Sequence, residues 1–113
     1  MPKIGFSGGR APVEVTDAVA RLGENITTAR TRRKMSLRDL ARRAGISHIT
    51  MGRIESGHAT TAIGAYWAVL WALGLESQFK DLAAPDRDEE GKALELARTP
   101  ARVRQTGDLD ADF

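Results

Sequence analysis

The chain has 113 residues, of which 42% are hydrophobic and 28% are charged, which suits one domain with a packed core. It contains no cysteine and only two histidines, which excludes a disulfide framework, a thiolate metal site and a cysteine nucleophile. We therefore expect no metal ion and no cofactor. The longest stretch without charge that we identify, residues 59–75, is shorter than the roughly 20 apolar residues of a membrane span, and the N-terminus carries no apolar signal-peptide core. We expect a soluble, cytoplasmic protein.

The net charge of +2 conceals an asymmetry along the chain. Residues 21–58 hold nine basic residues against three acidic ones, a net charge of +6. Residues 76–113 hold six basic residues against ten acidic ones, a net charge of −4. A basic head and an acidic tail are typical of a protein whose head meets nucleic acid and whose tail meets another partner. Two solvated faces are the alternative explanation.

The N-terminal residues and the first helix differ in pattern. Residues 1–14 contain three glycines and two prolines without any hydrophobic period, so we expect a flexible arm there. Residues 15–33 carry apolar side chains at spacings of three and four, which predicts a helix that Thr16 or Asp17 caps. Its apolar stripe consists of Val15, Val19, Leu22, Ile26 and Ala29.

Two short helices joined by a tight turn are predicted next. Ser36 fits the N-cap of the first, and Gly45 ends it. Ser47 fits the N-cap of the second, which runs to just before Gly57. Ala41 is small enough for the two helices to cross there. The side chains expected to lock them together are Leu40, Ala44, Ile46, Met51 and Ile54. Together these features indicate a helix-turn-helix, and a helical hairpin without a ligand is the alternative.

A fourth helix is predicted over residues 61–73, with Thr60 or Thr61 as its cap and Gly74 at its end. Its core-facing stripe is Ile63, Tyr66, Val69, Leu70 and Leu73. The remaining faces are also apolar, and such a helix must be covered on all sides. We expect a homodimer interface there, with a single larger core as the alternative. The interface residues are Trp67, Trp71, Leu75 and Phe79.

The domain is expected to span residues 15–83 and to be followed by an acidic extension over residues 84–113. A short helix or turn should end at Pro85. The extension is predicted to be helical over residues 86–98 and then to continue as a tail whose composition is typical of disorder.

Four short motifs resemble the Cro/C1-type helix-turn-helix family: LGENI, SLRDLA, AGIS and RIESG, at residues 22–26, 36–41, 44–47 and 53–57. The resemblance covers about residues 21–75. It implies an all-α, lambda-repressor-like domain of four to five helices that binds double-stranded DNA. Residues 88–104 are similar to the C-terminal segment of HipB-like antitoxins. That second resemblance implies a homodimer that represses its own operon at an inverted repeat and neutralises a HipA-like Ser/Thr kinase toxin.

The resemblance also implies residue roles, because in such a fold the second helix of the motif enters the major groove. Arg53 would contact guanine and Ile49 a thymine methyl group. The residues expected to contact DNA are Ser36, Arg38, Arg43, Ser47, His48, Ile49, Thr50, Arg53, His58 and Thr60. Gly52 is unusual inside a helix, and close approach of a phosphate or sugar would explain it. The resemblance makes Arg30 and Glu55 a buried ion pair with a structural role.

We expect no enzyme, since the sequence lacks a Ser-His-Asp set, a phosphate-binding glycine loop and paired metal ligands. Two other functions stay open. The chain fits a stand-alone transcriptional regulator without a toxin, and it fits an interaction adaptor whose helix-turn-helix has lost DNA binding.

Overall fold

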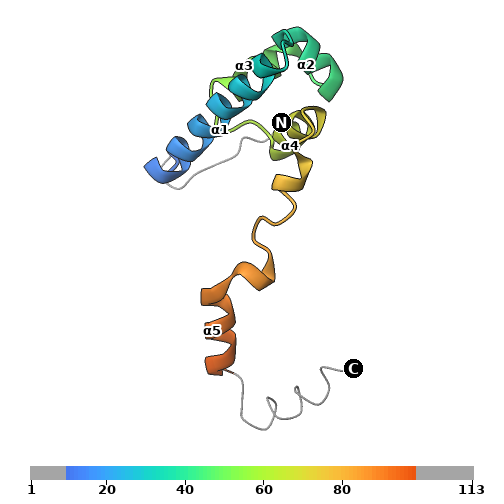
Figure 1. Cartoon of the computed structure of the whole chain (residues 1–113). Coiled ribbons are helices and arrows are strands. Elements are labelled where there is room, and N and C mark those ends of the chain that lie inside the picture. The colour runs from blue at the N-terminus through green and yellow to red at the C-terminus, as the bar shows by residue number, and fades with distance from the viewer. Residues whose placement is uncertain (1–9, 99–113) are drawn as a thin grey trace. The chain divides into compact units, whose positions relative to one another are not determined.

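The computed structural model describes residues 10–98, and every regular element within that range is a helix (Figure 1). The chain divides into two compact units, the first ending at Phe79 and the second beginning at Lys80. The sequence predicted a domain boundary between residues 83 and 84, four residues after this division. The expectations for the first nine residues of the arm and for the tail after residue 98 lie outside the described residues.

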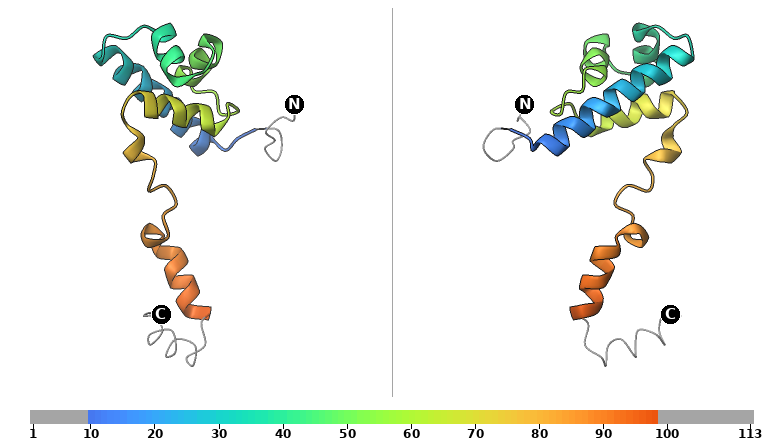
Figure 2. Two further views of the ribbon diagram at one scale, coloured as in Figure 1. Left: turned by 90° about the vertical axis from the view of Figure 1, so that its right-hand side faces the viewer. Right: turned by 60° about the vertical axis from the view of Figure 1, so that its left-hand side comes forward.

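Over residues 10–79, the first unit consists of four α-helices and a short 3₁₀ helix, η2. Helix α2 packs against both α3 and α4, and α1 packs against α3. Figure 2 shows α1 as the longest helix of this unit, with the shorter helices gathered along it. The elements are α1 (Val13–Arg32), α2 (Leu37–Ala44), α3 (His48–Glu55), α4 (Ile63–Ala72) and η2 (Glu76–Gln78).

Helix α1 begins earlier than the sequence suggested, and both caps proposed for it are wrong. Its first turn follows Pro12, whose carbonyl oxygen accepts hydrogen bonds from the amides of Val15 and Thr16 at 2.9 and 3.1 Å. The Thr16 hydroxyl donates to the Val13 carbonyl oxygen at 3.0 Å, so it lies inside the helix. Val15 is 38% exposed, and the packed stripe therefore starts only at Val19.

Helices α2 and α3 have the predicted ends. The Ser36 hydroxyl accepts a hydrogen bond from the Asp39 amide at 3.0 Å, and the Ser47 hydroxyl accepts one from the Thr50 amide at the same distance. These bonds satisfy amides that would otherwise lack a partner in the first turn of each helix. Gly45 after α2 adopts a φ of 77°, a left-handed conformation that glycine enters without steric cost.

Helix α4 lacks the predicted cap. Its N-cap position is Ala62, which offers no side-chain acceptor, so Thr60 and Thr61 belong to the preceding loop. Ile63 is the first helical residue and is 63% exposed, so its predicted place in the core is wrong. The C-terminal end agrees with the sequence, because Gly74 follows with a φ of 80°.

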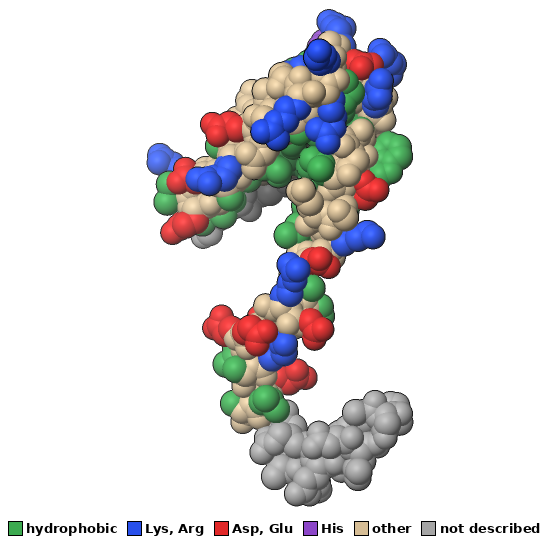
Figure 3. Space-filling view, in the orientation of Figure 1, with side chains coloured by type: hydrophobic (Ala, Val, Ile, Leu, Met, Phe, Trp, Pro, Cys, Tyr) green, Lys and Arg blue, Asp and Glu red, His purple; other side chains and the backbone are tan. Residues whose placement is uncertain are grey.

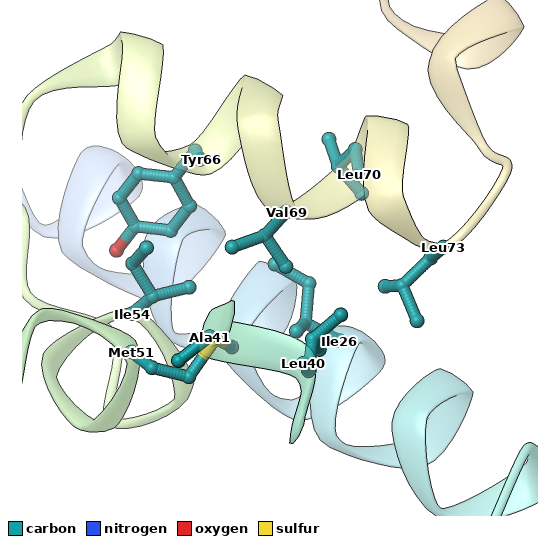
Figure 4. Close-up of a cluster of buried hydrophobic side chains, with 9 residues drawn as sticks. All are labelled: Ile26, Leu40, Ala41, Met51, Ile54, Tyr66, Val69, Leu70 and Leu73. Atoms are coloured by element: carbon teal, nitrogen blue, oxygen red, sulfur yellow. The ribbon is translucent and has the colours of Figure 1, made fainter. Parts of the chain in front are cut away.

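All four α-helices of the first unit contribute to one hydrophobic core (Figure 4). Predicted positions Leu40, Ala41, Met51 and Ile54 are each at most 2% exposed, while Ala44 and Ile46 are partly buried beside them. The buried residues are Ile26, Leu40, Ala41, Met51, Ile54, Tyr66, Val69, Leu70 and Leu73. This core fixes which side of α3 faces inward.

Two glycines bring α1 unusually close to the end of α3. A Cβ atom on Gly23 would lie 2.6 Å from the Ile54 carbonyl oxygen, and one on Gly57 would lie 2.7 Å from the Ala20 Cα atom. Neither position leaves room for a side chain. The backbone of α1 therefore packs directly on the C-terminal end of α3 and holds it in place.

The second unit contains η3 (Pro85–Arg87) and α5 (Glu89–Arg98). Pro85 begins the 3₁₀ turn, so the helix predicted from residue 86 starts only at Glu89. The Asp88 carboxylate accepts a hydrogen bond from the Gly91 amide at 2.9 Å and so stabilises the start of α5. No described residue of this unit is buried.

Candidate nucleic-acid interface

Helix α3 has one buried side and one side open to solvent. Met51 and Ile54 anchor it in the core with no exposed surface. On the other side, Ile49 is 60% exposed and Arg53 is exposed one turn later. Residues four apart lie on the same helix face, so Ile49 and Arg53 present an apolar and a basic group side by side.

The other residues predicted to contact DNA also lie in the first unit. Figure 3 shows Lys and Arg side chains spread over the part of this unit that contains α2. Thr50 is half-buried, and its amide donates to the Ser47 hydroxyl. The exposed members of the set are Ser36, Arg38, Arg43, Ser47, His48, His58 and Thr60.

The basic side chains of α2 differ in their partners. Arg42 and Arg43 both pair with Asp39, with 3.5 Å between Arg43 Nε and Asp39 Oδ2. Only Arg43 of the two is among the residues predicted to contact DNA, yet both are exposed and share this carboxylate. Arg38 and Arg53 form no ion pair within the described range 10–98. Their charges are therefore available to an external anion.

A groove lies beside α3, where the loop before α4 turns back. The Tyr66 hydroxyl donates to the His58 carbonyl oxygen at 2.9 Å and ties this loop to α4. Burial raises the pKa of Tyr66, which keeps the phenol in its donating form. The lining residues are Thr50, Arg53, His58, Thr60, Thr61, Ala62 and Ala65. The helical pattern placed Tyr66 in the core but gave no role to its hydroxyl, although a buried tyrosine hydroxyl usually requires a partner.

Gly52 lies in the interior of α3, between the buried Met51 and the exposed Arg53. A Cβ atom there would meet nothing within 4 Å. Glycine within a helix costs about 1 kcal/mol of stability relative to alanine. Packing inside the described protein therefore gives no reason for glycine at this position.

Arg30 and Glu55 form the ion pair that the family resemblance implies. Arg30 Nε lies 2.7 Å from Glu55 Oε2, and a second guanidinium nitrogen lies 3.1 Å from Oε1. The remaining nitrogen donates to the Met35 carbonyl oxygen at 2.9 Å. Hydrogen bonding to Glu55 raises the pKa of Arg30 despite its partial burial. The pair joins α1 to the last residue of α3 and directs neither charge outward.

The outer face of α4 carries aromatic side chains. Trp67 stacks on Phe79 with 4.8 Å between ring centroids, and both are partly buried. Leu75 is also partly buried, whereas Trp71 is 61% exposed. Of the four residues predicted for a dimer interface, only Trp71 leaves most of its surface to solvent.

Two further features bear on this site. Within residues 10–98, no three His, Asp or Glu side chains cluster in a way that could hold a metal ion. None of the helices in that range has the length and apolar content required to cross a bilayer.

Comparisons with protein-family models, with curated proteins and with solved structures found no match.

Proposed function

We propose that the first unit is a lambda-repressor-like helix-turn-helix domain that binds double-stranded DNA and represses transcription. The observation that carries this proposal is the orientation of α3. Its buried Met51 and Ile54 leave Ile49 and Arg53 exposed within a segment of net charge +6. An exposed helix on a basic surface has the shape and charge that the major groove accepts.

The residues divide into two kinds of contact. Arg53 is assigned a bidentate contact to guanine, and Ile49 a contact to a thymine methyl group. His48 and Thr50, at the start of α3, also face base edges, and these base contacts give sequence selectivity. The other residues contact phosphates and set affinity and register. The residues assigned to phosphates are Ser36, Arg38, Arg43, Ser47, His58 and Thr60.

Fluorescence anisotropy with a duplex from upstream of the coding sequence tests this proposal. The wild-type chain should prefer this duplex to a scrambled one, and its affinity should fall at least about tenfold as salt rises severalfold. Arg53→Ala should lose about 1–3 kcal/mol of discrimination between the two duplexes. Arg98→Ala, which removes the same charge from α5, serves as the matched control. Equal binding to both duplexes by the wild-type chain would refute the proposal.

We also propose that the domain acts as a homodimer through the outer face of α4. That face contains no charged residue, and Trp71 leaves 61% of its surface exposed. Tryptophan is enriched at the centres of protein interfaces. Two copies would place two recognition helices about one DNA turn apart, which matches an inverted repeat. Light scattering should give a dimer at micromolar concentration and a monomer for Trp71→Glu. A monomeric wild-type chain would refute this interface.

Neutralisation of a HipA-like kinase toxin is the last part of the proposal. Two features support it. Residues 88–104 are similar to the C-terminal segment of HipB-like antitoxins, and the second unit is acidic and leaves Leu94 of α5 57% exposed. A kinase-like reading frame should lie beside the coding sequence, and co-expression with it should yield a complex that Leu94→Asp weakens. The stand-alone regulator is the alternative. It is favoured if the wild-type chain binds its duplex but retains no kinase.

A further inference from the structure

The four glycines of the first unit that bear on α3 serve different purposes. Gly23 and Gly57 have no room for a Cβ atom, and Gly45 adopts a positive φ. The fold itself therefore explains these three. Gly52 shares none of these properties, because a side chain there would enter open space. If the protein alone decided the residue, alanine would be the more stable choice in this helix.

The position of Gly52 shows which surface it affects. It lies three residues after Ile49, on the same side of α3, and four before Ser56, the residue that follows the helix. Ile49 and Ser56 are both exposed. Arg53 follows directly on the adjoining side and forms no ion pair among the residues that the structure describes. The missing side chain thus leaves a flat spot in the exposed basic surface of α3.

We propose that the DNA duplex comes into van der Waals contact with the α3 backbone at Gly52, so that the absence of a side chain is itself a binding determinant. This inference rests on the proposed DNA-binding function and adds how deeply α3 enters the groove. The interior amides of α3 already bond to helix carbonyls, so Gly52 offers the duplex shape and not a donor. A side chain there would hold Ile49 and Arg53 away from the base edges.

Replacement of Gly52 by larger helix-forming residues tests the inference. Gly52→Ala and Gly52→Leu should both raise the melting temperature, by about 4 °C for a domain of this size. Affinity for the upstream duplex should fall about tenfold for alanine, because an inserted methyl group at a packed contact is unfavourable, and it should fall further for leucine. Asn25→Ala is the matched control. It improves helix propensity at an exposed position of α1 and should stabilise the protein without weakening DNA binding.

The possible outcomes separate this inference from the function on which it rests. Higher stability together with weaker binding in the order glycine, alanine, leucine supports it. A wild-type chain that binds DNA while Gly52→Ala binds equally well overturns the inference alone. A lower melting temperature for Gly52→Ala also overturns it, because glycine would then serve the fold. A wild-type chain that binds no duplex removes the proposed function and this inference together.

Discussion

The ion pair between Arg30 and Glu55 should be one of the most costly polar contacts to break in this protein. Their side chains are only 15% and 10% exposed, and two N–O contacts of 2.7 and 3.1 Å join them. Glu55→Ala would leave the guanidinium largely out of water with the Met35 carbonyl oxygen as its acceptor. Loss of one partner from a buried pair costs roughly 3–5 kcal/mol, and the residual exposure favours the lower end, about 3 kcal/mol. The total free energy of unfolding of a folded domain is only about 5–15 kcal/mol.

Urea unfolding followed by circular dichroism measures this cost. The double variant Arg30→Met/Glu55→Leu should recover most of the loss, because it strands no charge. Arg42→Ala is the control, since its pair with Asp39 involves a side chain that is 74% exposed and should contribute less than about 1 kcal/mol. Two results would contradict a buried, mutually dependent pair. One is a loss of unfolding free energy for Glu55→Ala no larger than that for Arg42→Ala. The other is a loss for the double variant equal to the sum of the losses for Arg30→Met and Glu55→Leu measured singly.

Three further changes probe the same fold. Ser47→Ala removes the hydroxyl that accepts the Thr50 amide and should cost about 1 kcal/mol in urea unfolding; an unchanged midpoint would count against the cap. Gly23→Ala places a methyl group 2.6 Å from the Ile54 carbonyl oxygen and should lower the free energy of unfolding by about 1–3 kcal/mol, whereas wild-type stability would contradict the close packing. Burial raises the pKa of Tyr66 above 10.0, so its stabilising contribution is present below pH 10.0 and is lost as pH rises through the folded pKa. Ultraviolet absorbance follows this single tyrosine, and ordinary titration would contradict its burial.

Local signals in the sequence predicted the α2–α3 pair well. Ser36, Gly45 and Ser47 act on the backbone within four residues of themselves, so their roles can be read without knowledge of distant contacts. The residues between them repeat at helical spacing, which identified Leu40 and Met51 as core. The sequence therefore also indicated which side of α3 is exposed.

Features that depend on distant contacts were harder to predict. The stacking of Trp67 on Phe79 requires the path of the chain after Gly74, which no local pattern gives. Similarly, Ile63 matches the helical stripe of α4 but lies at its first position, beyond the edge of the core. The close approach at Gly23 left one signal in the sequence, a glycine inside a regular helical pattern, but that signal does not identify the segment that approaches it.

The absence of buried side chains in residues 80–98 has a calorimetric consequence. A ten-residue helix such as α5 is marginal in water when tertiary packing does not support it. It should lose its ellipticity gradually on warming and absorb little heat in any sharp peak. The cooperative endotherm should then correspond to the first unit alone, at about 0.7 kcal/mol for each of its residues near 60 °C.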